Sequence, residues 1–366
     1  MEGKLSYVGR LAPSPTGALH WGNVRTFMIA WLRARSQGGR VIMRMEDLDH
    51  PKDKPGAAAQ AVEDLRWLGF DWDEEYVQSE RKALYREALE ILRNLPIPQS
   101  PNRTIEQSNN RTIEQSNNRT IEQSPNLPIP LVYPCVCSRK DVESAQSAPH
   151  AGEQLHYPGT CRGRFSSWRE AYAAKGAAPC WRFAVPAGTV VEFEDAFAGK
   201  FRQDVGETLG DFPLARDEFG AGYTLAAVVD DLLMGVTEVV RGDDLLAATP
   251  AQILVARALQ AACASQSPTH STSQPLNVST LSTLSTSRLP AYCHVPLVVG
   301  PDGRRLAKRH GDTRVSTFRQ EGGRPEKLLG RLAASCGWCG LGELVTLREL
   351  LGRFNLSTIP HTPFMI

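Results

Sequence analysis

Residues 10–23, Arg-Leu-Ala-Pro-Ser-Pro-Thr-Gly-Ala-Leu-His-Trp-Gly-Asn, constrain the fold of this chain more than any other segment. Pro13 and Pro15 lack an amide N–H and restrict the residues before them, so neither a strand nor a helix can run through this part. Residues 6–11 have the character of a short strand, and residues 23–34 carry apolar side chains at helical spacing. The segment therefore predicts a strand, a tight loop and a helix in immediate succession.

The predicted loop brings His20 and the backbone N–H groups near Gly22 to the N-terminus of a helix. Helix N-termini favour anions, because their first N–H groups are unpaired and the helix dipole is positive there. One interpretation of the loop is therefore a phosphate site. The other is that His20 is an ordinary polar surface residue, which is the commoner case for a single histidine in a loop.

A second strand is predicted for residues 40–45, and it completes a βαβ unit with the first strand and helix. Glu46 follows directly at the carboxyl end of this strand, the edge at which open α/β sheets bind ligands. Amphipathic helices are predicted for residues 57–68 and 80–92. This part of the chain therefore indicates an α/β fold with a parallel sheet.

A similar arrangement is expected in the second half of the chain. Residues 223–229 are apolar and predict either a buried strand or the start of a helix. A strand is predicted for residues 236–240, and Arg241 follows at its carboxyl end. We expect a helix to open with Thr249 as its N-cap and proline at its first position, and a further strand at residues 294–299.

Two segments are predicted to be insertions without structure of their own. Residues 95–131 contain Arg-Thr-Ile-Glu-Gln-Ser three times, and such short polar units bury too little surface to offset the entropy of ordering them. A second stretch, about 265–288, is rich in Ser and Thr. Because long loops cost little extra closure entropy, both are expected to interrupt one fold without dividing it.

Three cysteines have a spacing that is typical of a metal site. Cys135 and Cys137 are one residue apart, Cys161 follows after a Pro-Gly turn, and three such thiolates can converge on a tetrahedral zinc ion. The alternative is three small buried side chains. A fourth ligand would come from His156 or Tyr157, and spacing alone favours His156, because imidazole is the more usual zinc ligand.

Composition limits the choice of partners and compartment. Lys and Arg number 41 against 40 Asp and Glu, so net charge gives no overall attraction to nucleic acid. We see no apolar run near 18 residues and no signal-peptide core after Met1. The prediction is a cytoplasmic protein without a membrane partner, expected as a monomer, whose eight cysteines serve as metal ligands or free thiols.

Residues 13–23 resemble the ATP-binding signature of class I aminoacyl-tRNA synthetases, in particular the glutamyl branch. The resemblance implies that His20, Gly22 and Asn23 bind ATP, which enters as a substrate with Mg²⁺. Asn23 stands where the wider class often has histidine. It also implies that glutamate is bound by five further residues: Arg10, Ser14, Glu46, Tyr223 and Arg241. Taken singly, each of these could instead belong to a structural ion pair or hydrogen bond.

Residues 304–311 resemble the second, lysine-rich signature of the same class. Arg305 and Ala307 depart from the family pattern, whereas Lys308 is retained. The resemblance implies that Lys308 is catalytic together with His20 and neutralises the charge that develops on pyrophosphate. As a bare charge cluster, the segment would be a solvated loop.

The cysteine pattern resembles the zinc site of the glutamyl-queuosine tRNA(Asp) synthetases, which are truncated relatives of glutamyl-tRNA synthetase. That resemblance favours Tyr157 over His156 as the fourth ligand beside Cys135, Cys137 and Cys161. It implies transfer of glutamate from its adenylate to the queuosine base in the anticodon of tRNA(Asp). Only residues 312–366 follow the second signature, so a complete anticodon-binding region is not expected here.

The implied fold is a Rossmann-like class I aminoacyl-tRNA synthetase catalytic domain with a small zinc-binding insertion and a short helical C-terminal stem-like region. The expected segments are catalytic 1–94, repeat insertion 95–131, zinc-binding 132–180, catalytic 181–312 and helical 313–366. Two other functions stay open: a shortened glutamyl-tRNA synthetase that charges the tRNA 3′ end, and a catalytically silent tRNA-binding paralogue.

Overall fold

The computed structural model describes most of the chain, namely residues 6–48, 53–98, 129–145, 156–218, 220–265, 280–304, 306 and 312–366. The chain divides into two compact units, each built from separated segments. The first unit comprises 1–89, 190–203 and 219–366, and the second comprises 90–189 and 204–218. The boundaries of these units differ from those of the predicted segments 132–180 and 181–312. Strands that come before and after residue 181 belong to one sheet in the second unit.

The first unit begins with the predicted βαβ unit. Strands β1 (Val8–Leu11), β2 (Arg40–Met45) and β3 (Glu74–Val77) form a parallel sheet in the order β1-β2-β3. Helix α1 (Trp21–Arg35) connects the first two strands, and α2 (Ala57–Trp67) and α3 (Lys82–Arg93) follow at the predicted positions. A short 3-10 helix, η1 (Gln78–Arg81), precedes α3. The prediction of a parallel α/β fold is confirmed.

A second sheet of the same unit has the order β7-β6-β10-β9. Its strands are β6 (Val190–Asp195), β7 (Gly199–Asp204), β9 (Glu238–Gly242) and β10 (Ala291–Val295), and β10 is parallel to both β6 and β9. This sheet continues beside β1, since the Thr237 amide before β9 donates to the Val8 carbonyl at 2.9 Å. Strands far apart in the sequence are thereby neighbours.

Residues 223–229, for which the sequence allowed either a buried strand or the start of a helix, belong to helix α7 (Tyr223–Leu233), and most of the apolar residues of this helix are buried. The predicted cap at Thr249 is wrong. The 3-10 helix η2 (Asp243–Ala248) runs directly into α8 (Thr249–Ser265), so Thr249 has a helical backbone and its hydroxyl donates to the Leu245 carbonyl at 3.1 Å. Residues 243–265 are long and apolar enough to cross a bilayer, but half of their most apolar stretch is buried inside the fold, as in a core helix.

Part of the predicted second insertion is ordered. Residues 280–285 form the 3-10 helix η3 (Thr280–Ser285), and Leu281 and Leu284 are fully buried. Two leucines spaced three residues apart in a Ser- and Thr-rich stretch supply enough apolar surface to hold this turn against α8. The remainder of that stretch, 266–279, and residues 99–128 with the three repeats lie outside the described residues.

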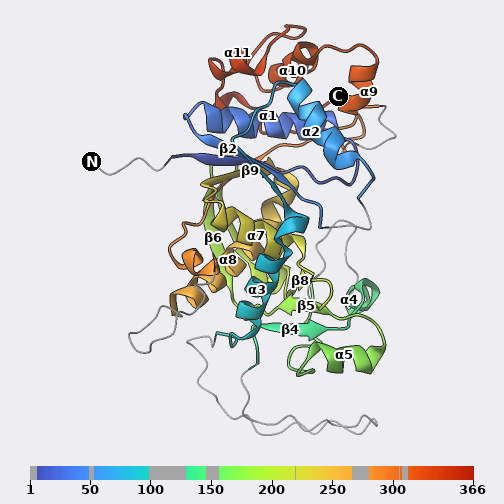
Figure 1. The fold of residues 1–366 in the computed structure, drawn as a ribbon, viewed down its shortest axis with the longest axis vertical. Helices are drawn as coiled ribbons and strands as arrows, with labels where there is room; N and C mark the ends of the chain where they lie inside the picture. Colours follow the sequence, from blue (N-terminus) through green and yellow to red (C-terminus); the bar gives the residue numbers. More distant parts are fainter. Residues whose placement is uncertain are drawn as a thin grey trace, which may run out of the picture. The chain divides into compact units, whose positions relative to one another are not determined.

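The C-terminal residues also belong to the first unit. Helices α9 (Val315–Gln320), α10 (Pro325–Ala334) and α11 (Leu347–Leu351) are followed by η5 (Leu356–Thr358), and the short strands β11 (Val298–Val299) and β12 (Phe364–Met365) pair in parallel. Helices α10 and α11 contact α1 (Figure 1). Their buried leucines join the hydrophobic core around α1, so the predicted helical region packs against α1 in the first unit.

The second unit contains an antiparallel sheet in the order β4-β5-β8, made of β4 (Val132–Cys135), β5 (Cys180–Phe183) and β8 (Phe212–Ala215). Helices α4 (Arg139–Ala145), α5 (Trp168–Lys175) and α6 (Val205–Thr208) lie in the same unit. A small hydrophobic core of its own contains Tyr133, Cys135, Tyr157 and Cys161.

Candidate active site

His20 is the N-cap of α1. Its Nδ1 accepts the Asn23 amide at 3.4 Å, and the Asn23 side-chain oxygen accepts the His20 amide at 3.1 Å. This reciprocal pair replaces the usual Ser/Thr and Glu/Gln of a capping box. A neutral His20 ring that accepts at Nδ1 carries its proton on Nε2. The loop therefore presents a ring donor at the start of the helix, where sequence reasoning expected it.

Gly22 allows this arrangement. A Cβ atom at this position would lie 3.1 Å from Nδ1 and Cε1 of the His20 ring and 3.4 Å from Val298. Such contacts are tighter than ordinary van der Waals packing, so a side chain here would displace the ring. The close approach of the histidine to its own helix thus favours glycine at this position of the signature.

A cavity of about 550 Å³ lies at the carboxyl ends of β1, β2 and β9. It brings together every residue predicted to bind glutamate or ATP within the described part of the chain. These residues are Arg10, Ser14, His20, Gly22, Asn23, Glu46, Tyr223 and Arg241. The remaining predicted residue, Lys308, lies outside the described residues, as do Arg305 and Ala307.

Both flanks of the lysine-rich signature are described, and the segment after it approaches the loop of His20. The Trp21 amide donates to the Thr313 carbonyl at 3.1 Å, and the Val315 amide donates to the Leu19 carbonyl at 2.9 Å. Two segments almost 300 residues apart in sequence are therefore joined by backbone hydrogen bonds. The two predicted signatures are anchored to each other through residues that adjoin them.

Two residues that line the cavity, Arg10 and Glu46, belong to a network of buried charges behind it. The Arg10 Nε lies 3.2 Å from an Asp231 oxygen, and Arg44 contacts the same oxygen at 2.6 Å and Glu46 at 2.9 Å. Burial acts to raise the pKa of Asp231, but the Arg44 and Arg10 guanidinium groups lower it below the usual value. Asp231 is therefore ionised and holds Arg10 at the wall of the cavity.

Arg241 is held differently, although it is only 5% exposed. Its Nε donates to His294 Nε2 at 2.9 Å, its Nη2 donates to Thr249 Oγ1 at 2.7 Å, and its Nη1 lies 3.4 Å from the Tyr223 hydroxyl. No carboxylate of the described residues contacts this guanidinium. A buried cation with neutral partners only is costly, so the cavity favours an anionic ligand.

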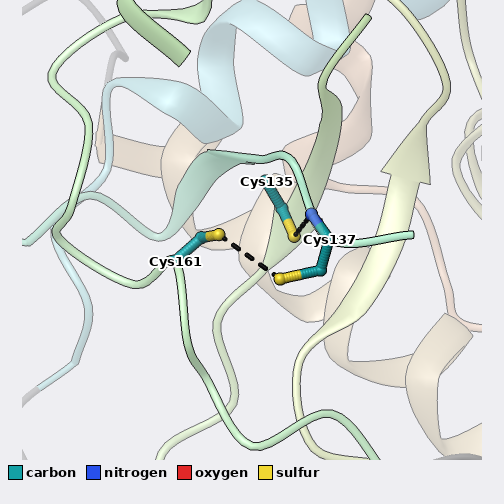
Figure 2. Close-up of side chains that lie close together, drawn as sticks. All are labelled: Cys135, Cys137 and Cys161. Carbon is teal, nitrogen blue, oxygen red and sulfur yellow. Dashed lines mark hydrogen bonds between the residues drawn. The ribbon is translucent and has the colours of Figure 1, made fainter. Parts of the chain in front are cut away.

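The three predicted zinc-binding cysteines converge in the second unit (Figure 2). Their sulfur atoms all lie within 4.8 Å of one another, and the Cys137 and Cys161 sulfurs are 3.6 Å apart. Hydrogen bonds from the Cys161 and Cys180 thiols lower the pKa of Cys135, despite the opposing effect of burial.

Tyr157 points into this cluster and His156 does not. The Tyr157 hydroxyl lies 3.2 Å from the Cys135 sulfur and 3.6 Å from the Cys137 sulfur, and it accepts the Cys161 amide at 2.9 Å. His156 Nε2 instead lies 2.9 Å from the Gly206 carbonyl. Gly210, in the left-handed region at φ 62°, packs against the Tyr157 carbonyl, where a side chain would collide.

Sequence reasoning missed two neighbours of the cysteine cluster. Cys180 lies opposite Cys135 in the β4–β5 register, which no local pattern reveals. The Arg182 guanidinium lies 3.9 Å from the Tyr157 ring centroid and is 8% exposed. A cation here offsets the negative charge of thiolates.

Sequence reasoning also missed the partners of Arg10 and Arg241 around the cavity. Asp231, which pairs with Arg10, lies on α7, far from Arg10 in the sequence, so no local pattern indicates that the two residues are partners. His294 and Asp195 carry no signal of their own, because only strand pairing brings them near Arg241.

The chain is similar to proteins of known family. Residues 7–95 and 130–274 match the family described as tRNA synthetases class I (E and Q), catalytic domain. A glutamyl-Q tRNA(Asp) synthetase of Symbiobacterium thermophilum is 41% identical, over 98% of this chain and 95% of that protein. A protein of the same name from Rhodopirellula baltica is 41% identical, over 99% of this chain and 97% of that protein. The crystal structure of a glutamate-tRNA synthetase from Elizabethkingia anophelis has a TM-score of 0.70 at 22% identity, and the match covers 99% of this chain and 68% of that one.

Proposed function

Because the chain belongs to the class I tRNA synthetases for glutamate and glutamine, and among them to the glutamyl-Q tRNA(Asp) synthetases, we propose that it activates glutamate with ATP and transfers the glutamyl group to the queuosine base in the anticodon of tRNA(Asp). The fold is that of a class I catalytic domain, and the enzyme is a ligase of this class.

One observation in the structure of this chain supports the proposal. A single cavity contains the capped loop of His20 and two buried arginines, Arg10 and Arg241. Arg241 contacts no carboxylate among the described residues, so a dicarboxylic amino acid supplies the anion that it lacks. Glutamate and a nucleotide can therefore meet in one place.

The reaction is an in-line displacement. A carboxylate oxygen of glutamate attacks the α-phosphorus of ATP, a mixed anhydride forms, and the bond to pyrophosphate breaks. The protein needs no nucleophile of its own, so positioning and charge neutralisation supply the rate enhancement. ATP enters with Mg²⁺ on its phosphates, which offsets part of their negative charge.

We assign ATP binding to His20, Gly22 and Asn23, and we assign a catalytic role to His20 and Lys308. His20 Nε2 and the Gly22 amide at the start of α1 can donate to phosphate oxygens. Lys308 neutralises the leaving pyrophosphate. This role is supported by the backbone hydrogen bonds that join residues 313–315 to the His20 loop.

We assign glutamate binding to Arg10 and Arg241 for the carboxylates and to Glu46 for the ammonium group. Arg44 donates a hydrogen bond to Glu46 at 2.9 Å, and Glu46 lines the cavity. Ser14 and Tyr223 line the same cavity and supply hydroxyl groups. Each assignment follows from the charge or hydrogen bond that the amino acid requires.

We also propose that Cys135, Cys137, Tyr157 and Cys161 bind a structural zinc ion. Zn–S bonds of about 2.3 Å place two tetrahedral thiolates roughly 3.8 Å apart. The separation of 3.6 Å between the Cys137 and Cys161 sulfurs fits this requirement, and the Tyr157 oxygen lies at a similar distance from Cys137. A bound zinc would join β4 to the loop of Tyr157 and Cys161. We further propose that the enzyme acts as a cytoplasmic monomer.

The test is glutamate-dependent exchange of pyrophosphate into ATP without tRNA, followed by transfer assays with labelled glutamate. We expect exchange above background, and transfer to queuosine-containing tRNA(Asp) but not to unmodified tRNA(Glu). Charging of tRNA(Glu) alone would support the shortened glutamyl-tRNA synthetase. Absence of exchange would support the silent tRNA-binding paralogue.

A further inference from the structure

A chain of buried hydrogen bonds leads from the core of the first unit to Arg241. Asp195 ends β6, His294 lies on β10 and Arg241 lies on β9, so three neighbouring strands each contribute one residue. His294 Nδ1 lies 2.6 Å from Asp195 Oδ2, and His294 Nε2 accepts from Arg241 Nε at 2.9 Å. Asp195 and His294 are 2% and 1% exposed, so neither of them reaches a ligand.

The partners of His294 fix its tautomer. Arginine Nε can only donate, so His294 Nε2 must be the acceptor and the ring proton must lie on Nδ1. That proton is donated to Asp195. The carboxylate is held in turn by the amides of Phe197 at 3.0 Å and Ala198 at 2.8 Å. The ring is therefore neutral and has one orientation.

Thr249 fixes the other inner edge of the guanidinium. Its hydroxyl accepts from Arg241 Nη2 at 2.7 Å, and it can donate to the Leu245 carbonyl at 3.1 Å. With Nε and Nη2 both engaged on the core side, the plane of the guanidinium is set. The Nη1 edge, beside Tyr223, is the part that faces the cavity.

This arrangement differs from that of a buried arginine with a purely structural role, which pairs directly with a carboxylate. A direct carboxylate partner would neutralise Arg241 and occupy its donors. Here the Asp195 carboxylate is separated from Arg241 by a neutral ring, so it offsets the charge from a distance without using the outer donors. The fork geometry that makes arginine selective for carboxylates is thereby oriented before a ligand binds.

We propose that Asp195, His294 and Thr249 are positioning residues that hold Arg241 in the orientation in which it binds a substrate carboxylate. The inference rests on the proposed function, and it extends the site to residues that do not touch the substrate. It states that glutamate affinity depends on the hydrogen-bond polarity of His294 and not only on its volume.

Two substitutions of His294 separate polarity from volume. A glutamine side chain reaches about as far as Nε2 and can offer its carbonyl oxygen to Arg241, whereas asparagine ends near the position of Nδ1. We expect His294→Asn to raise the apparent KM for glutamate in pyrophosphate exchange by roughly 10- to 100-fold, the loss typical of a hydrogen bond to a charged group. His294→Gln should restore most of the affinity, and the KM for ATP should stay unchanged in both.

Asp195→Asn tests the tautomer. An amide nitrogen facing Nδ1 would force the ring proton onto Nε2, opposite the Arg241 donor, so the KM for glutamate should again rise although the shape is kept. Cys293→Ala is the matched control. Cys293 is a fully buried neighbour on the same strand, so this variant lowers stability without changing either KM.

Several results would overturn the inference. Exchange by the wild-type chain with an unchanged glutamate KM in His294→Asn and Asp195→Asn would refute the positioning role alone. An equal rise of both KM values would show a general loss of structure instead of positioning. If neither variant folds, Thr249→Val removes the acceptor of Nη2 together with the contacts of the same hydroxyl to His294 Nε2 and the Leu245 carbonyl, and an unchanged glutamate KM there also refutes the positioning role. Absence of exchange in the wild type would refute the proposed function as well.

Discussion

The cavity of the first unit and the cysteine cluster of the second both gather buried ionisable groups, but the groups face different ways. In the cluster, the Tyr157 hydroxyl lies within 3.6 Å of the sulfurs of Cys135 and Cys137, and these groups face one another. In the cavity, Arg10 and Arg241 lie at the wall and face an open volume. A converging set encloses an ion, whereas a wall of charges receives a larger molecule.

This difference separates two kinds of contribution. A metal inside the cluster would stabilise the second unit, because it joins β4 to a loop with little secondary structure. The cavity is stabilised without a ligand by ion pairs such as that of Arg10 with Asp231. Substitutions in the cavity should therefore reduce catalysis with little effect on stability, and substitutions in the cluster should do the reverse.

The largest effect is expected for Arg241→Ala. Removal of a buried charge that pairs with a substrate carboxylate costs roughly 2–5 kcal/mol, so kcat/KM for glutamate in pyrophosphate exchange should fall by about 30- to several thousand-fold. Arg241→Lys keeps the charge but not the planar fork, and it should recover only part of the activity.

Arg202→Ala is a suitable control for this measurement. Arg202 lies on β7 of the same unit, pairs with Glu192 and is two-thirds exposed, so its loss should leave exchange unchanged. Similar activity in Arg241→Ala and Arg202→Ala would mean that the Arg241 guanidinium does not bind the substrate. The proposed difference, in which the cavity serves catalysis and the cluster serves stability, would then no longer hold for the cavity.

Cys161→Ser should have the next largest effect, and on a different property. Loss of one thiolate should reduce the bound zinc, measured by metal analysis, from about one ion per chain to a small fraction of that. The midpoint of thermal unfolding should fall by roughly 10 °C, while pyrophosphate exchange at low temperature is retained. Cys339→Ser, at a half-buried thiol of the first unit, is the control for which zinc content should not change.

Tyr157→Phe sharpens the same point within the cluster. Phenylalanine keeps the ring beside Arg182 and removes only the oxygen that lies between the sulfurs, so zinc affinity should fall by about 10- to 100-fold with a modest loss of stability. His156→Gln should retain full affinity, because His156 lies against the Gly206 carbonyl. Full zinc retention in Tyr157→Phe would remove Tyr157 from the ligand set.

The contrast also explains which parts could be predicted from the sequence. The βαβ unit and the position of His20 at a helix N-terminus depend on neighbours within a few residues, so proline, glycine and apolar spacing were sufficient. Thr249 was misread because a Thr-Pro pair is an N-cap signal only when the preceding residues are not helical, and η2 precedes it here. Residues 280–285 were misread because two leucines were outweighed by the polar residues around them.

The site divides along the same line. Residues near the two signatures could be named through family resemblance, and the cavity brings the described ones together. His294 and Asp195 could not be found, because their roles depend on the strand order β6-β10-β9, which brings together residues 99 and 53 positions apart in the sequence. Cys180 was missed for the same reason. Long-range strand pairing is thus the information that local patterns lack.

The smallest predicted effect is a decline in stability at acidic pH, which we attribute to His294, the buried histidine behind the cavity. Burial lowers the pKa of His294 below its usual value, and Arg241 lowers it further, whereas Asp195 opposes the shift. Asp195 itself has its pKa lowered to about 2, mainly by its hydrogen bonds with His294 and backbone amides, which outweigh burial, so it stays charged throughout. Since the unfolded chain takes up this proton near pH 6.5 and the folded chain only at lower pH, stability should decline as the pH falls from 6.5 through the folded pKa. One proton limits the slope to about 1.4 kcal/mol per pH unit. Urea unfolding between pH 7 and 5 should show a shallower decline for His294→Gln than for the wild type, and equal slopes would mean that His294 is not kept neutral by its surroundings.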